Sequence, residues 1–205
     1  FEASKERAHS STSPEELEKL AEVKNIEVRI LVAGNKNTPI LILEKLAEDE
    51  QSGVRENVVR SGNSSKLKRS VREKLAEDKE NSIRELLALS LVTKKTNTPV
   101  SIMEKLAEDE VQLVRRYVAD SENTPVSVLE KLAEDEEWEV RFSVVRNANT
   151  TVSLFEKLAK DEHFIVRESV AKNANTPASM LEKLAEDEDE DVRKAVIENP
   201  NFPSK

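Results

Sequence analysis

One short string recurs along this chain at nearly constant spacing, and it limits the possible folds more than any other feature. Glu-Lys-Leu-Ala occurs seven times in 205 residues. The successive copies are 26, 29, 31, 26, 26 and 26 residues apart. A fixed period in this range indicates a repeat protein, in which each unit is one supersecondary element stacked on its neighbours. The copies begin at Glu18, Glu44, Glu73, Glu104, Glu130, Glu156 and Glu182.

Two further anchors follow each copy in fixed order. Val-Arg or Ile-Arg comes eight residues after the anchor leucine, and Asn-Thr-Pro or a relative comes eight residues after the arginine. The third copy is the exception, with 13 residues from Arg84 to Asn97. Three ordered anchors predict about seven units, preceded by an N-terminal segment or cap at 1–13 and followed by the start of a truncated eighth unit at 201–205. We place the units at 14–36, 37–62, 63–96, 97–122, 123–148, 149–174 and 175–200.

Each unit is predicted to form two short helices. Glu-Lys-Leu-Ala favours helix, and Thr-Pro is typical of a helix start because Thr caps well and Pro suits the first helical position. In the fifth unit this predicts a first helix from about Pro125 to Glu134 and a second around Val140, Val144 and Val145. Helices of about ten residues are marginal alone, so stacking must stabilise them. The expected fold class is all-α, an α-solenoid of about seven two-helix repeats.

The composition fits a thin core shared between units. Aromatic residues make up 3% of the chain and charged residues 36%, so a single deep core would lack large side chains. The net charge of −9 argues against nucleic acid as the main partner, since phosphate binding needs concentrated Lys and Arg. The chain has no cysteine, no apolar run of membrane-spanning length and no visible signal peptide. We therefore expect no membrane partner and a cytoplasmic location. Because the chain begins at Phe1 rather than Met, we expect an excised or processed piece.

The combined pattern resembles a known family. Leu-Glu-Lys-Leu-Ala-Glu-Asp, then Val-Arg-x-x-Val-Ala, then Asn-x-Asn-Thr-Pro resembles the leucine-rich repeat variant family and is similar to the wider HEAT-like group. The resemblance covers about residues 14 to 203. It implies a right-handed superhelix in which an α-helix pairs with a second helix that is α or 3₁₀, and it implies protein interaction rather than chemistry. A described member carries an iron–sulfur cluster on N-terminal cysteines, which this chain lacks, so we expect no cofactor.

No motif for catalysis or metal binding appears. The chain has no nucleophile elbow, His-Glu-x-x-His or phosphate loop, and neither of its two histidines lies in a motif. Asp187, Asp189 and Asp191 have the spacing that opens a calcium loop, but Val192 stands where that loop needs Gly. We expect no enzymatic activity and no metal.

An aspartate recurs six residues before the repeat arginine, except in the first unit, where Val23 takes its place. We interpret this ladder as structural, with Asp capping the second helix and pairing with Arg within or between units. A row of ligand-binding arginines is the alternative, but a ligand rarely needs one copy per repeat. The ladder includes Asp109 with Arg115, Asp135 with Arg141, and Asp161 with Arg167.

Large side chains interrupt the repeat pattern in the fourth to sixth units. They occupy the columns two residues before the Val-Arg pair and directly after its arginine. Trp, Tyr and Arg dominate interface hot spots, so these residues are the candidate protein-binding set. The alternative is that Trp138 and Phe164 fill gaps between units. The set is Arg116, Tyr117, Trp138, Phe142 and Phe164.

A locally basic segment at 55–74 is the second candidate site. Its basic residues outnumber its acidic ones, so it is a candidate contact for anions or nucleic acid. A solvated loop, or a complement to the acidic remainder, is the alternative. The candidate anion-binding residues are Arg60, Lys66, Lys68, Arg69 and Arg72.

These observations favour a non-enzymatic protein-binding scaffold or adaptor whose protein partner the sequence does not identify. Nucleic-acid or anion binding through 55–74 is one alternative, and the repeat domain of a larger enzyme or defence-type protein is another. The start of an eighth unit predicts an uncapped apolar end, which would self-associate or continue in a longer chain.

Overall fold

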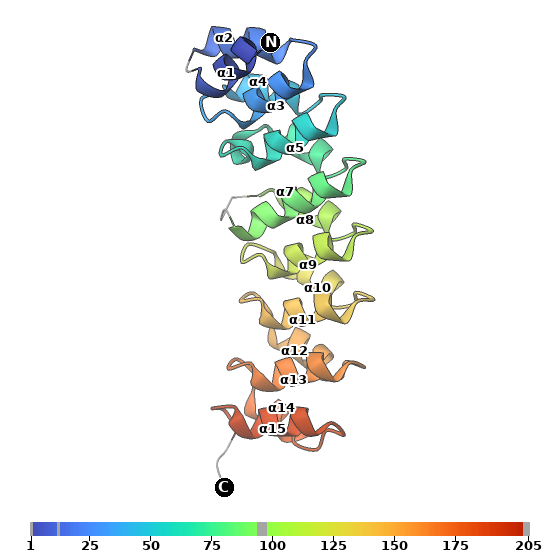
Figure 1. Cartoon of the computed structure of the whole chain (residues 1–205). Coiled ribbons are helices and arrows are strands. Elements are labelled where there is room, and N and C mark those ends of the chain that lie inside the picture. The colour runs from blue at the N-terminus through green and yellow to red at the C-terminus, as the bar shows by residue number, and fades with distance from the viewer. Residues whose placement is uncertain (1, 12, 94–97, 203–205) are drawn as a thin grey trace. The chain divides into compact units, whose positions relative to one another are not determined.

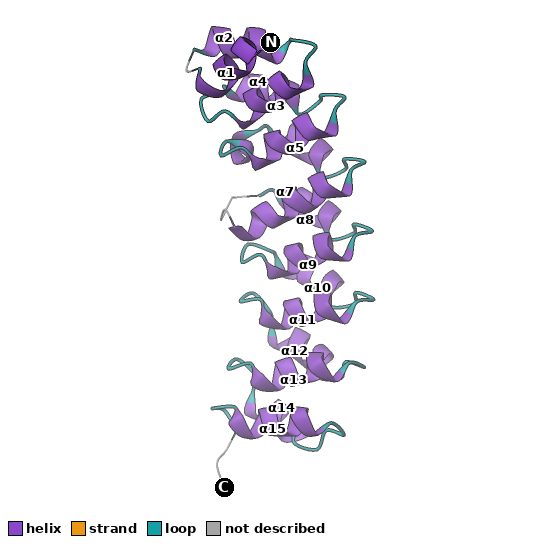
Figure 2. Ribbon diagram, viewed as in Figure 1, coloured by secondary structure: helices purple, strands orange, loops and turns teal. Residues whose placement is uncertain are grey.

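The computed structural model describes residues 2–11, 13–93 and 98–202. These residues form α-helices, one 3₁₀ turn and no β-strand (Figure 2). The chain divides into two compact units, Phe1–Lys105 and Leu106–Lys205, and each is described by itself. Asn97 in the third Asn-Thr-Pro anchor, and residues 203–205 in the predicted eighth unit, lie outside the described residues.

Unit 1 begins with α1 (Glu2–Ser10) and then alternates short and long helices (Figure 1). Each long helix packs on the preceding one, and α3 packs in the same way on α1. The long helices are α3 (Ile26–Gly34), α5 (Ser52–Arg60) and α7 (Asn81–Thr93). The short helices are α2 (Pro14–Ala21), α4 (Ile40–Leu46), α6 (Arg69–Leu75) and α8 (Val100–Leu106), and the 3₁₀ turn η1 (Ser64–Lys66) precedes α6.

Unit 2 repeats this alternation. Each long helix packs on the next long helix and on the short helix that precedes it in the chain. The long helices are α9 (Gln112–Asp120), α11 (Trp138–Arg146), α13 (Phe164–Lys172) and α15 (Glu190–Glu198). The short helices are α10 (Val126–Leu132), α12 (Val152–Leu158) and α14 (Ala178–Leu184).

The core is a thin apolar layer between the short and long helices. In the fifth repeat, Val128 and Leu132 of α10 and Val140, Val144 and Val145 of α11 are all buried. Full burial of one such side chain stabilises the fold by roughly 1.5–3 kcal/mol. The predicted apolar stripes are therefore the faces that pack.

The predicted α-solenoid of two-helix repeats is confirmed, because the described chain is all-helical and neighbouring elements contact in chain order. The resemblance left the second helix as either α or 3₁₀. Both helices of each described repeat are α. The 3₁₀ geometry is confined, in the described residues, to η1, which lies where the second repeat carries its three-residue insertion.

The helix starts differ from the prediction. In α10, Pro125 is the N-cap and the helix begins one residue later. The Thr124 hydroxyl does not cap this helix; it donates to the Val118 carbonyl in the last turn of α9, at 2.5 Å. Thr124 is buried there, so it joins the end of one helix to the start of the next. In α2 the predicted arrangement does occur, with Ser13 as N-cap and Pro14 in the first turn.

Asparagine side chains also join neighbouring repeats. The Asn147 amide donates to the carbonyls of Ala119 and Ser121, at 2.6 and 2.8 Å, where α9 ends. Asn199 makes the equivalent bond to the Ala171 carbonyl at 2.7 Å. Carbonyls in the last turn of a helix need such partners from outside it. These bonds fix how far each long helix lies along its neighbour.

Candidate protein-binding surface

The repeat arginine of one long helix is bound to the aspartate of the next repeat. Arg141 of α11 donates from Nε and Nη2 to the two carboxylate oxygens of Asp161, at 2.7 and 2.8 Å. A paired contact of this kind fixes the orientation of both groups. The same contact is made by Arg115 with Asp135, Arg167 with Asp187, Arg29 with Asp49 and Arg55 with Asp78.

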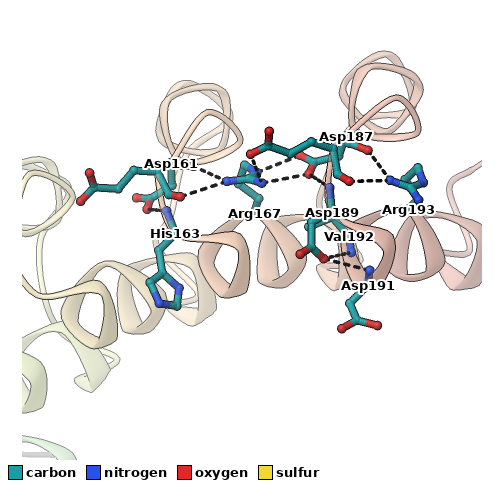
Figure 3. Close-up of polar contacts among 10 residues, drawn as sticks. Asp161, His163, Arg167, Asp187, Asp189, Asp191, Val192 and Arg193 are labelled. Atoms are coloured by element: carbon teal, nitrogen blue, oxygen red, sulfur yellow. Dashed lines mark hydrogen bonds and ion pairs between the residues drawn. The ribbon is translucent and has the colours of Figure 1, made fainter.

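Each ladder residue also organises its own loop. Arg167 donates from Nη1 to the Asp161 carbonyl at 2.8 Å, and Asp161 accepts the backbone N–H of His163 at 2.9 Å (Figure 3). His163 is the N-cap residue of α13. Asp109 accepts the N–H of Val111 in the same way, at 2.9 Å. The ladder therefore sets where each long helix begins.

Burial and pairing act in opposite directions on these carboxyl groups. Burial alone raises the pKa of Asp187, but the hydrogen bonds from Arg167 and from the Asp189 backbone outweigh it, so its pKa is lowered. The pKa values of Asp49 and Asp78 are lowered by the same balance. The side chains of Arg167 and Asp187 are each 9% exposed. A ligand would have to displace this buried pairing, which favours the structural interpretation of the ladder.

Aromatic rings from two consecutive repeats gather where α11 and α13 begin. The Trp138 ring stacks on His163, with centroids 4.5 Å apart and an interplanar angle of 9°. His163 lies 5.5 Å from the Phe164 ring at 15°, and Phe142 meets Trp138 edge-on at 6.3 Å. Trp138 and Phe142 are half-buried, while Phe164 is 38% exposed. Trp138 therefore fills space between repeats, and Phe164 leaves its ring open to solvent.

A groove between α11 and α13 continues from this cluster. Arg146 lies over the Phe142 ring, with its guanidinium carbon 5.5 Å from the ring centroid. Across the groove, Lys172 pairs with Glu168 at 2.5 Å. The groove has a volume of about 490 Å³, and Ile165 contributes to its apolar lining. The long helices here are aromatic at their start and basic at their end.

Arg116 and Tyr117 lie on α9, which packs against α11. Arg116 is exposed and lies 3.7 Å from Asp120 on its own helix, and Tyr117 is half-buried. Among the described residues, no ring contact joins Tyr117 to the Trp138 cluster. The five predicted protein-binding residues thus form a cluster of three, with two further residues on the neighbouring helix.

Four of the five candidate anion-binding residues are exposed side chains that already have partners. Their bonds tie the basic segment to nearby acidic or polar groups, so little of its charge is available to a phosphate. The bonds are Arg60 to Glu56, Lys66 to Asn63, Lys68 to Glu44, and Arg69 to Glu73.

Arg72 is a core residue. Its side chain is 5% exposed and donates to the Thr98 hydroxyl at 2.7 Å. Burial lowers its pKa. It stands directly before Glu-Lys-Leu-Ala, where the other repeats bury an apolar residue, and this column was the sequence signal for its position. The apolar residues of the column are Leu17, Leu43, Met103, Leu129, Phe155 and Leu181.

The acidic run near the end of the chain is used by the fold. Asp187 is bound to Arg167, and Asp189 caps α15 by accepting the N–H groups of Asp191 and Val192 (Figure 3). Within residues 2–11, 13–93 and 98–202, no group of three His, Cys, Asp or Glu side chains is placed to hold a metal ion. No described helix is both long and apolar enough to cross a membrane.

Sequence reasoning missed two members of the cluster, His163 and Arg146. His163 follows Trp138 by 25 residues, one less than the repeat period, so the repeat places it against the preceding repeat's Trp138. Arg146 follows Phe142 by four residues and therefore shares its helix face. Both could have been found by reading the columns diagonally across neighbouring repeats.

Comparison with solved structures identifies the fold. A protein described as "a leucine-rich repeat variant with a novel repetitive protein structural motif" superposes with a TM-score of 0.69 at 25% identity. The match covers 91% of this chain and 71% of that one. The chain has the fold of a leucine-rich repeat variant. The resemblance predicted from the repeat anchors is therefore confirmed.

Two other repeat structures are more distant. The E. coli protein YibA has a TM-score of 0.48 at 15% identity, covering 96% of this chain and 95% of that one. Computationally designed armadillo repeat proteins for modular peptide recognition have a TM-score of 0.38 at 17% identity, covering 98% and 99%. No protein-family model and no curated protein sequence matches the chain.

Proposed function

We propose that this chain is a non-enzymatic protein-binding scaffold and that the exposed face of α11 and α13 binds the protein partner. The observation that carries the proposal is the stacked row of Trp138, His163 and Phe164, whose last ring is open to solvent. Aromatic side chains flanked by arginine are the usual centres of protein interfaces. Arg146, over the Phe142 ring, supplies that flank.

The fold itself does not require aromatic residues in these columns. The column that holds Trp138 holds Ser52, Asn81 and Gln112 in other repeats, and those repeats form the same pair of helices. A half-buried tryptophan and an exposed phenylalanine are therefore additions to the repeat. This supports binding over simple gap filling.

Affinity capture from a cell lysate tests the proposal, using wild-type chain and the Trp138→Ala, Phe142→Ala double variant. We expect captured proteins to survive nuclease and high salt and to be lost with the double variant, because an aromatic interface depends little on salt. The matched control is Ile26→Ala, Ile30→Ala, which changes the same two columns in the first repeat and should leave capture intact. Circular dichroism melts verify that all chains fold. Equal capture by the two variants would reject the proposed surface.

The alternative of anion binding through 55–74 has less support, because its exposed cations already have partners and Arg72 is buried. It predicts a different capture result, in which nucleic acid is bound at low salt and released as salt rises. The further alternative, the repeat domain of a larger enzyme or defence-type protein, also stays a prediction.

A further inference from the structure

A second groove lies beside the aromatic row, between the starts of α13 and α15. It has a volume of about 430 Å³. One wall carries the exposed Phe164 ring and the other carries acidic residues from the next repeat. Its lining is Glu162, His163, Phe164, Arg167, Glu188 and Asp189.

The charge in this groove is negative. Its one cation, Arg167, is matched by the buried carboxylate of Asp187. The Glu162 and Glu188 side chains are 86% and 90% exposed, and Asp189 adds a third carboxylate that caps α15. The groove therefore combines an open aromatic face with uncompensated negative charge, the two features that attract a cation to a protein surface.

We propose that this groove binds a cationic side chain, arginine or lysine, of the partner protein. The Phe164 ring provides a cation–π face, and Glu162 and Glu188 provide the opposing charge. The inference rests on the proposed function, since it names the chemistry of the partner at one end of the same surface. It commits to a basic segment of a protein, because nucleic acid would be repelled by these carboxylates.

The first repeat offers a natural comparison. Its equivalent groove is built on the same Arg29–Asp49 pair and is lined by Glu22, Val23, Lys24 and Glu50. By repeat register, Lys24 takes the place of Glu162, and an asparagine and an isoleucine take the places of His163 and Phe164. The groove thus forms without the ring and without the excess charge, so neither is needed to hold the fold.

A two-dimensional ¹H–¹⁵N NMR titration of the full chain tests the proposal. The probe is N-acetyl-arginine methylamide, and the control is the citrulline analogue, which keeps the shape and loses the charge. We expect saturable shifts of the amides at 162–164 and 188–189 with the arginine probe alone. The amides at 24–26 and 50–51 serve as the internal control and should not move. Phe164→Leu should weaken binding about 2- to 5-fold.

Three results would overturn the proposal: no shifts at millimolar probe, equal shifts at the two grooves, or equal shifts with citrulline. The Glu162→Gln, Glu188→Gln variant separates this inference from the proposed function. If this variant binds the captured protein with unchanged Kd, the cation site is refuted while the protein-binding surface stands. If the aromatic double variant also binds unchanged, the proposed function itself fails.

Discussion

Arg141 and Asp161 form a two-point ion pair that links consecutive repeats, with only 8% and 6% of the two side chains exposed. Arg141 also donates to the Asp135 carbonyl at 2.6 Å, so one guanidinium holds its own loop and the next. Coupling of this kind makes each repeat depend on its neighbour, which is what gives a stack of short helices its stability.

Breaking this pair should be costly. Asp161→Asn leaves the Arg141 guanidinium buried without its counter-charge, and we expect the free energy of unfolding to fall by about 3–5 kcal/mol. Urea unfolding measures the loss. As a control, Arg141→Met with Asp161→Leu removes both charges and should recover much of it. A single variant within experimental error of wild type would mean that the pair does not link the repeats.

Acid should weaken the ladder. The pKa of Asp187 is lowered in the folded chain, so the unfolded state binds more protons and stability rises with pH through this range. The contribution is complete above the unfolded pKa of about 3.9 and is lost as pH falls through the lower folded pKa. We expect Asp187→Asn to flatten the acid limb of stability measured from pH 7 to pH 2. A limb parallel to that of wild type would contradict this.

A gap in a second, exposed ladder predicts a stabilising change. Lys157 pairs with Glu134 of the preceding repeat at 2.6 Å, and Lys131 pairs likewise with Glu108. In the same register, Lys183 meets Lys160 instead of an acid. Lys160→Glu should therefore raise Tm slightly, by about 1–2 °C, because exposed pairs contribute little. Lys157→Glu should lower Tm, and both effects should disappear in 1 M salt. A lower Tm for Lys160→Glu would reject the register.

Arg72 offers a larger gain. Arg72→Leu restores the apolar residue that the other repeats bury in this column, and it removes a charge whose burial lowers its pKa. We expect the free energy of unfolding to rise by about 1–3 kcal/mol. Arg72→Met is a second variant that fills the same space with a different shape. A loss of stability in both, measured in urea, would show that the bond to Thr98 outweighs the cost of burial.

The fold was largely predictable because the anchors report directly on packing. Val140, Val144 and Val145 were placed in a core stripe by spacing alone, and they are buried. The helix start at Pro125 was wrong by one residue, because local capping preferences do not include the Val118 carbonyl that the Thr124 hydroxyl reaches. A bond to the previous helix depends on the tertiary arrangement, which a local rule does not contain.

The candidate site was predictable only in part. Trp138, Phe142 and Phe164 were found because they break the repeat columns, and the structure brings them together. The stack on His163 and the placement of Arg146 over a ring depend on contacts across helix turns and between repeats, which column-by-column comparison leaves out. Arg72 was grouped with its sequence neighbours when its repeat position decided its burial.

Hydrogen–deuterium exchange of the chain, alone and with a captured partner, tests the central claim most directly. The proposed surface predicts slower exchange at 138–146 and 164–172 in the complex, with the equivalent helices at 26–34 and 52–60 unchanged. Protection confined to 55–74, or spread equally over all long helices, would contradict it.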